Sequence, residues 1–283
     1  MSELLLPFQF DFMRSAFLIG TLIAVPTALL SCFLVLKGWA LMGDAVSHAV
    51  LPGVVLAWMA GVPLLLGAFA AGLFCAVATG WLAENSRVKR DTVMGVVFSG
   101  MFGLGLVLYA AIRTDVHLDH ILYGNMLGVG RADLAVAGSI GAVVTLLVAA
   151  KWRDLLAHAF DPAQARVSGL PVAWLHYGLL AALSATVVAT LSAVGLVLAI
   201  GLLIAPGAVA FLVVRSFGTM LLAAVAVNVA AMIVGIWLAF HLDAAPAPTV
   251  ILVLTVAFVV AFGWRLRRNK RLTGSTGGSS AAA

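Results

Sequence analysis

The sequence predicts an all-α protein, a polytopic transmembrane helical bundle with eight or nine membrane segments. Of its 283 residues, 64% are hydrophobic and only 10% are charged, with a mean hydropathy of +1.16. Soluble domains are usually about a quarter charged. Apolar stretches long enough to cross a bilayer, roughly 20 residues each, recur along the chain. The net charge of +5 comes from short basic clusters between these stretches, so it indicates no nucleic-acid partner.

Seven apolar stretches are each long enough to form one span: residues 16–36, 38–60, 62–83, 92–112, 134–150, 219–240 and 247–264. A further charge-free block, residues 177–214, is too long for one span and is punctuated by Gly195, Gly201 and Pro206. It predicts a full helix followed by a short or broken segment near 201–214. Residues 1–272 are expected to form one transmembrane domain. Residues 273–283 have the low complexity of a flexible, appended tail.

The basic residues predict the orientation, because cytoplasmic loops carry an excess of lysine and arginine. The segments 84–91, 151–166 and 265–271 are therefore expected on the cytoplasmic side. Lys37 and Arg215 fall on that side if successive helices alternate in direction. This scheme requires the short segment near 201–214 to cross the membrane, or nearly so.

One predicted span carries two ionisable residues, Asp44 and His48, in the stretch MGDAVSHAVLPGVVLAW. Residues four apart share one helix face, about 5–6 Å apart at Cβ. Each such group near the bilayer centre costs on the order of 2.5–3.5 kcal/mol, which favours a functional role. A carboxylate and a neutral imidazole together suit a divalent transition metal such as Mn, Fe or Zn. The alternative is a structural hydrogen bond between the two side chains.

Pro52 strengthens the metal interpretation. A proline inside a helix removes the hydrogen bond to the carbonyl four residues earlier, here that of His48. The freed oxygen, with Ser47 beside it, is expected near the two side chains, and irregular backbone at membrane depth is tolerated where it lines a cavity.

Other histidines and carboxylates are weaker candidates. Asp115, His117, Asp119 and His120 lie together on a predicted outer loop, where a solvated loop is the favoured interpretation over metal contact. His241 and Asp243 are two residues apart, so they do not share a helix face. His158 and His176 flank a cytoplasmic loop, and histidines at membrane boundaries are commonly interfacial.

The stretch around Asp44 and His48 resembles the signature segment of permease subunits of bacterial ATP-binding-cassette (ABC) importers for manganese, zinc and iron. VGLVLAIGLLIAPGAVAFLV (194–213) resembles that family's glycine- and proline-broken segment, and AFDPAQARVSGLP (159–171) resembles its ATPase-docking loop. The resemblance runs over nearly the whole chain. It implies a multi-pass permease domain in the bacterial inner (plasma) membrane.

The resemblance also implies roles for particular residues. Asp44 and His48 would be metal ligands in the translocation path. The ATPase-coupling loop would comprise Phe160, Asp161, Ala165, Gly169 and Leu170. The cargo would be Mn²⁺, with Fe²⁺ or Zn²⁺ as alternatives, because Ser47–His48 followed by Pro52–Gly53 resembles the manganese and iron branch. No tightly bound cofactor is implied.

The implied partners are a second permease protomer, identical or paralogous, two cytoplasmic ABC ATPases and an extracytoplasmic metal-binding protein. The chain has no G-x-x-x-x-G-K-[ST] phosphate loop, so ATP hydrolysis is expected in the separate ATPase and the chain is not itself an enzyme. Two ligands are too few to hold an ion, and two facing protomers would supply Asp44 and His48 twice.

Three other functions are less favoured. An ATP-independent metal channel or secondary transporter would suit broken helices, but no proton-relay chain of carboxylates is present. A membrane metalloprotease would need more metal ligands, and the sequence holds no H-E-x-x-H. Importers of metal chelates or cobalamin usually have longer chains with more spans.

Overall fold

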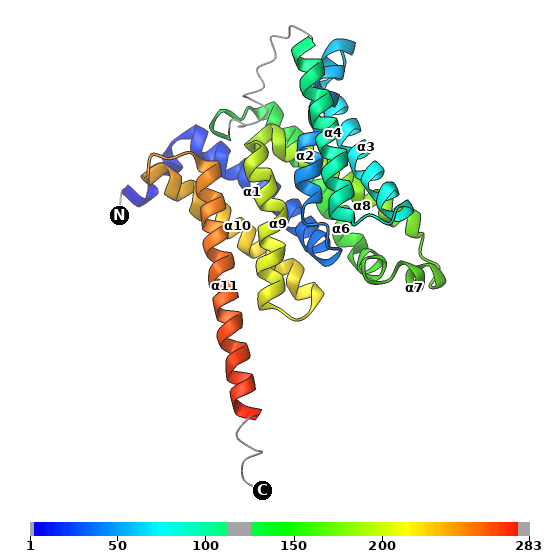
Figure 1. The fold of residues 1–283 in the computed structure, drawn as a ribbon. Helices are drawn as coiled ribbons and strands as arrows, with labels where there is room; N and C mark the ends of the chain where they lie inside the picture. The colour runs from blue at the N-terminus through cyan, green and yellow to red at the C-terminus, as the bar shows by residue number, and fades with distance from the viewer. Residues whose placement is uncertain (1–2, 112–125, 277–283) are drawn as a thin grey trace.

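A computed structural model describes residues 3–111 and 126–276 of the chain (Figure 1). Nine of the described helices are long and apolar enough to cross a membrane, and the described residues form no strand, which confirms the predicted all-α bundle. The elements in chain order are η1 (Glu3–Gln9), α1 (Asp11–Leu36), α2 (Met42–Ala60), α3 (Leu64–Asn85), α4 (Arg90–Ala111), η2 (Met126–Gly128), α6 (Arg131–Phe160), α7 (Pro162–Val167), α8 (Val172–Val194), α9 (Leu196–Val213), α10 (Phe217–His241) and α11 (Pro246–Thr276).

The long charge-free block divides into two spans at Gly195. This residue ends α8 and begins α9 with φ +83°, a conformation that glycine adopts without steric cost. The short segment that the sequence predicted near 201–214 is therefore α9, which at 18 residues is the shortest candidate span among the described helices. Pro206 does not break it. The next residue, Gly207, lies so close to Ser31 of α1 that a Cβ there would be 2.6 Å from the Ser31 carbonyl oxygen.

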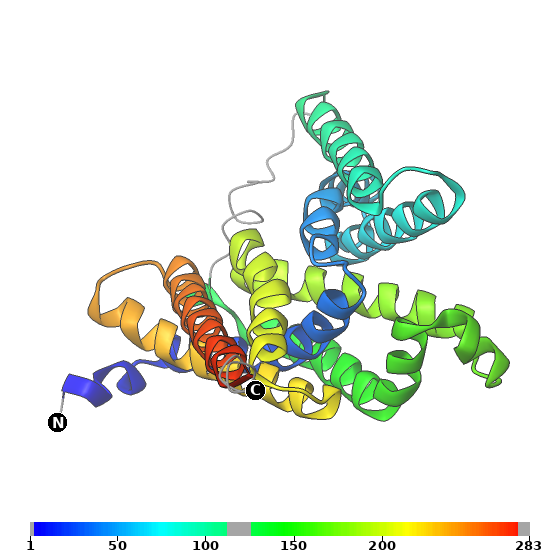
Figure 2. The same cartoon turned by 60° about the horizontal axis from the view of Figure 1, so that its bottom comes forward.

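The helices form two groups around a shared core. The central helix α1 packs against α6, α9 and α10, and α11 covers α9 and α10. Helices α2, α3 and α4 form the second group, which Figure 2 shows beside the first. Small residues allow their close approach: a Cβ on Gly53 of α2 or on Gly67 of α3 would clash with the carbonyl of the other. Such contacts between small residues are typical of helices packed in lipid.

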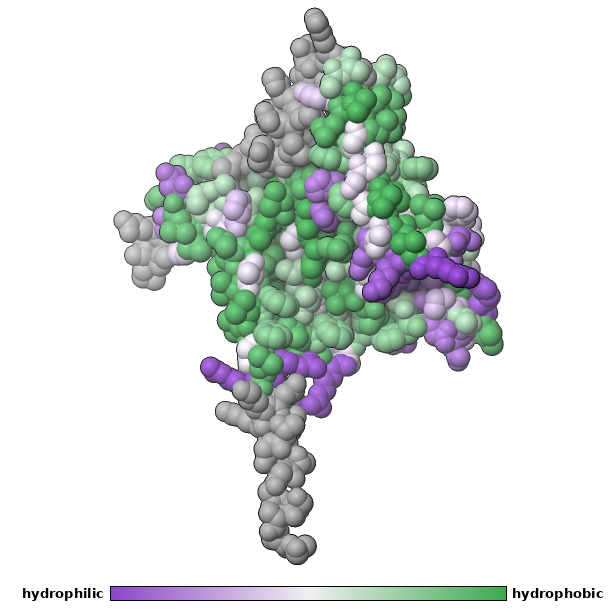
Figure 3. All heavy atoms as spheres, in the orientation of Figure 1, coloured by the Kyte–Doolittle hydropathy of each residue, from purple (hydrophilic) through white to green (hydrophobic). Residues whose placement is uncertain are grey.

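The basic segments lie together at one end of the bundle. Lys37 after α1, Arg90 at the start of α4 and Arg166 of α7 line a single pocket. At the same end, the Arg265 guanidinium of α11 donates to the Leu212 carbonyl of α9, with an N–O distance of 2.9 Å. Figure 3 shows two strongly hydrophilic groups on the lower half of the molecule, below a largely apolar surface. This arrangement agrees with alternating helices whose basic ends face one side of the membrane.

Candidate functional site

Asp44 and His48 contact each other on α2. Asp44 lies in the first turn, and His48 follows one turn later. His48 Nδ1 is 3.1 Å from the Asp44 carboxylate oxygen Oδ1 and 3.0 Å from the Asp44 carbonyl oxygen. A carbonyl oxygen only accepts hydrogen bonds, so this geometry makes Nδ1 the donor in a neutral ring. The lone pair of the ring is then on Nε2, which is available to a cation.

The pair is neither sealed in the core nor fully exposed. The His48 side chain is 27% exposed and that of Asp44 is 31% exposed. The imidazole lies against two phenylalanines of α4, with ring centroids 5.7 Å from Phe98 and 5.5 Å from Phe102. Figure 3 shows a small hydrophilic patch over α2, surrounded by apolar surface between α9 and α4. The two side chains are thus partly accessible from outside this chain, beside the two phenylalanine rings.

Small residues hold α2 in this position. A Cβ on Gly105 of α4 would lie 2.9 Å from Pro52 Cδ and 2.8 Å from Leu51 Cγ, so α4 rests directly on the Pro52 turn. On the other side, a Cβ on Gly43 would lie 2.9 Å from Leu203 Cδ1 of α9. A larger residue at Gly105 would clash with the Pro52 backbone and displace α2, and the pair with it, whereas at Gly43 the end of the Leu203 side chain could move aside.

Ser47 does not extend the site as a side-chain ligand. It is buried, and its hydroxyl donates to the Gly43 carbonyl with an O–O distance of 2.7 Å. Helix α2 continues through Pro52, which is also buried. Within residues 3–111 and 126–276, no group of three or more histidine, cysteine, aspartate or glutamate side chains is placed to hold a metal ion. In this part of the chain, Asp44 and His48 are therefore a pair without a third such side chain beside them.

The other metal candidates give no comparable geometry. Asp115, His117, Asp119 and His120 lie outside the described residues. His241 is at the end of α10, where its Nδ1 is 2.9 Å from the Trp237 carbonyl oxygen and its ring is 4.1 Å from the Trp237 ring. Asp243 follows the helix with φ +50°. Both side chains are exposed, and within the described residues no hydrogen bond or ion pair joins them.

The predicted coupling loop forms a short capped helix. Asp161 ends α6 and is the N-cap of α7, and its carboxylate oxygen Oδ1 accepts hydrogen bonds from the backbone N–H groups of Ala163 (2.9 Å) and Gln164 (3.0 Å). Gly169 reverses the chain after α7 with φ +78°. Ala165 is buried, and Leu170 packs partly buried against the main core. The loop is thus attached to the bundle by Ala165 and Leu170 and is held in shape by Asp161.

Apolar side chains around this loop face outward. Phe160 is 70% exposed, Val167 is 89% exposed and Trp174, in the first turn of α8, is 82% exposed. In a membrane protein, exposed apolar side chains at the end of a bundle face either the lipid interface or a partner protein. Because basic residues surround them, this surface lies at the end of the bundle predicted to be cytoplasmic.

The structure also assembles a group that the sequence did not predict. His158 of α6 and His176 of α8 have ring centroids 5.8 Å apart, and Lys37 Nζ lies 3.2 Å from His158 Nε2. Trp39 contacts the His176 ring at a centroid distance of 5.7 Å. Lys37 and Trp39 precede both histidines by more than 100 positions, so no local spacing could have indicated the cluster.

Comparison with known proteins shows similarity along nearly the whole chain. The sequence profile described as "ABC 3 transport family" matches residues 9–265. The chain is 54% identical over 255 residues to the chelated iron transport system membrane protein YfeD of Yersinia pestis, covering 90% of this chain and 86% of that protein. It is 41% identical over 258 residues to the manganese transport system membrane protein MntB of Synechocystis, covering 90% of this chain and 83% of that protein.

The fold is similar to that of a solved structure, PsaBC from Streptococcus pneumoniae in complex with Fab. The TM-score is 0.82 at 31% sequence identity, and the match covers 92% of this chain and 95% of that chain. The sequence profile and the curated relatives thus agree with the fold. This protein belongs to the ABC 3 transport family, as a multi-pass transport subunit of the bacterial inner membrane whose ATPase is a separate partner.

Proposed function

We propose that this chain is the membrane-spanning permease of an ATP-driven importer that moves a divalent transition metal into the cytoplasm through Asp44 and His48. The relatives named above are iron and manganese transport proteins, which supports Mn²⁺ or Fe²⁺ as cargo, with Mn²⁺ preferred and Zn²⁺ as an alternative. The observation that carries the proposal is the contact between the Asp44 carboxylate and His48 on a partly exposed face of a membrane helix.

The geometry of the pair suits cation binding. A metal-binding histidine usually donates its second ring N–H to a carboxylate or carbonyl, which fixes the tautomer and the ring orientation. Here His48 Nδ1 makes this contact with Asp44, so Nε2 would bind the cation. Nδ1 also contacts the Asp44 carbonyl oxygen, so the Asp44 carboxylate would be free to turn from Nδ1 toward the ion and act as a negatively charged ligand. Imidazole and carboxylate are both ligands that Mn²⁺ and Fe²⁺ accept.

Dimerisation would complete the site. One described chain offers two side-chain ligands, whereas a divalent ion that has lost its water needs more. A second permease protomer, identical or paralogous, would present its own aspartate and histidine across the lumen. Coordination shared between two protomers also suits transport, because an ion held too tightly would not leave.

The segment from Phe160 to Leu170 would receive the mechanical input, within a permease domain that spans residues 1–272. We propose that α7 docks on one of two cytoplasmic ABC ATPases, with Phe160 and Val167 as apolar contacts. An extracytoplasmic metal-binding protein would deliver the ion on the opposite side. Ala165 and Leu170 attach α7 to the bundle, so movement of the ATPase would reach α6 and α8 directly.

The test is uptake of radioactive Mn²⁺ and Fe²⁺ by proteoliposomes that contain the assembled importer. We expect Asp44→Ala and His48→Ala to lower uptake at least about tenfold, as loss of a metal-site residue typically does. The matched control is the exposed pair at the end of α10, His241→Ala and Asp243→Ala, which should retain uptake. Unchanged uptake in both α2 variants would remove the proposed site.

A further inference from the structure

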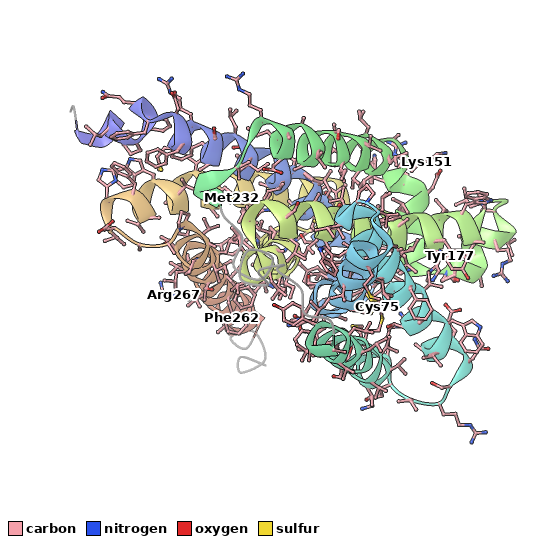
Figure 4. The ribbon with its side chains drawn as sticks, turned by 90° about the horizontal axis from the view of Figure 1, so that it is seen from above. Cys75, Lys151, Tyr177, Met232, Phe262 and Arg267 are labelled. Atoms are coloured by element: carbon pink, nitrogen blue, oxygen red, sulfur yellow. The ribbon has the colours of Figure 1, made fainter. Side chains whose placement is uncertain are left out.

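A pocket of about 400 Å³ opens at the basic end of the bundle, away from Asp44 and His48. Its lining comes from α3, α4, α6, α7, α8 and the segment after α1. The lining residues used below are Lys37, Trp39, Glu84, Arg90, His158 and Arg166. Tyr177 of α8 also lines it, and Figure 4 shows Tyr177 on the side of the bundle opposite Phe262 and Arg267 of α11.

The pocket carries an excess of positive charge. Lys37, Arg90 and Arg166 line it, whereas Glu84 is its one carboxylate. None of the three cations forms a salt bridge with a carboxylate in the described part of the chain. Lys37 Nζ and the Arg90 guanidinium instead lie 4.6 Å and 4.9 Å from the Trp39 ring centroid. A divalent cation would be repelled here, so the pocket is not a second site for the cargo.

Two buried N–H groups of the lining have no hydrogen-bond partner among the described residues. One is Trp39 Nε1, on a side chain that is 1% exposed. The other is His158 Nδ1, on a side chain that is 3% exposed. An ammonium group only donates, so the Lys37 contact makes His158 Nε2 the acceptor and leaves the ring hydrogen on Nδ1. A buried donor without an acceptor is costly, and such a group calls for a specific explanation.

We propose that this pocket binds a phosphoryl anion, supplied by the headgroup of an anionic phospholipid or by free phosphate. Apart from the exposed Glu84 carboxylate, the unmatched groups of the lining are donors or cations, and a phosphoryl group presents only acceptor oxygens and negative charge. Arginine guanidinium groups are well suited to it. The pocket lies at the basic end of the bundle, which is predicted to be cytoplasmic. This position supports the lipid source, because basic pockets between membrane helices on the cytoplasmic side bind lipid headgroups.

A bound phosphoryl group would connect two parts of the molecule. Arg90 begins α4, whose Phe98 and Phe102 lie against His48, and Arg166 belongs to α7. An anion bound by both arginines would join the helix group that carries Asp44 to the loop proposed to dock on the ATPase. This coupling role depends on the proposed function, whereas anion binding does not. The exposed side chains of Phe160, Val167 and Trp174 do not line the pocket, so docking and anion binding would use different surfaces.

The charge of Lys37 adds a pH dependence. Burial, together with the charge of the neighbouring Arg90, lowers the pKa of Lys37 to about 8, although Glu84 acts in the opposite direction. The other titratable or charged groups that face it are His158, His176, Arg166 and Tyr177. An anion binds the protonated amine more tightly, so affinity should be greatest below pH 8 and should fall as pH rises above that value.

The experiment follows thermal unfolding of the purified full chain in detergent. Phosphatidylglycerol, inorganic phosphate and zwitterionic phosphatidylcholine are added separately. At a concentration of about 100 times its dissociation constant, we expect phosphatidylglycerol to raise the midpoint temperature of unfolding by about 5 °C. Phosphatidylcholine should have little effect. An equal shift with inorganic phosphate would assign the site to free phosphate, and a shift with the lipid alone would assign it to the headgroup.

Three variants make the test specific. Arg90→Ala and Arg166→Ala should each lose most of the shift in unfolding midpoint. Because Arg166 is exposed, its variant is expected to fold. Arg87→Ala is the control, because it removes the same charge from the exposed loop before α4 but lies outside the pocket lining. Absence of a shift with both phosphatidylglycerol and phosphate, or equal losses in Arg87→Ala and Arg90→Ala, would overturn the proposal. Neither outcome depends on metal uptake.

Discussion

The Asp44 carboxylate can contribute to the site in two ways, through its negative charge and through its hydrogen bond to His48 Nδ1. An asparagine separates the two, because its amide oxygen still accepts from Nδ1 while the charge is lost. If Asp44 binds the cation directly, the charge is essential. If it only orients the imidazole, the hydrogen bond alone is sufficient.

We therefore expect Asp44→Asn to lower metal uptake nearly as much as Asp44→Ala, because carboxylate charge contributes to binding of a divalent ion. The measurement is initial uptake rate against Mn²⁺ concentration in reconstituted vesicles. Asp44→Glu serves as the comparison, since it keeps the charge on a longer side chain. Full uptake in Asp44→Asn would show that the aspartate is only a structural partner of His48.

For single residues, the sequence predicted the contact between Asp44 and His48 but not the side chains that surround it. The spacing of four residues was sufficient to place Asp44 and His48 on one helix face. The two phenylalanine rings beside His48 were not predictable, because Phe98 and Phe102 lie about 50 positions away on α4. Ser47 was expected beside the pair, yet its hydroxyl bonds to the backbone of its own helix, as buried serines in helices often do.

Among the elements, α7 depends on a single residue for its N-terminus. Asp161 accepts hydrogen bonds from two backbone N–H groups that would otherwise be without a partner in the first turn. Loss of such a cap typically costs about 0.5–2 kcal/mol of helix stability, which is large for a six-residue helix.

We expect Asp161→Ala to loosen α7 and to lower the number of metal ions transported per ATP hydrolysed by the assembled importer. Asp161→Asn should restore most of this ratio, because asparagine caps helices about as well as aspartate. Ser168→Ala, at the other end of α7, is the control. A normal transport ratio in Asp161→Ala would show that the shape of α7 does not control coupling.

The boundary between α8 and α9 shows which sequence signals are reliable. Both Gly195 and Pro206 suggested a break, and only the glycine produces one. Gly195 adopts a positive φ that interrupts the helix, whereas the chain around Pro206 continues as a helix held against α1 by the Gly207–Ser31 contact. Packing of α9 against α1 thus accompanies a continuous helix at Pro206, despite the tendency of proline to break helices.

For the molecule as a whole, the proposed site requires an account of how two ligands per chain would hold one ion. The described residues offer no third ligand, and the Asp44–His48 face is partly exposed. A second permease facing the first would cover that surface and double the ligand set.

We therefore expect one bound Mn²⁺ for each pair of permease protomers, not one for each protomer. The measurement is metal content by mass spectrometry after gel filtration of the assembled complex. The same measurement on complexes with His48→Ala is the control and should show less than half an ion per pair. One ion per protomer, retained when the complex is dissociated, would contradict a shared site.

Composition and periodicity alone determined the membrane class, nearly all the spans and the helix that carries Asp44 and His48. These features are local: a bilayer selects apolar helices of a given length, and a fixed helical period sets which side chains share a face. Only the tertiary structure decided that α4 covers His48 and that Lys37, Arg90, His158 and Arg166 form one basic pocket. Those groups come from separate helices, and close contacts between small residues, such as Gly105 on Pro52, determine where each helix meets its neighbour.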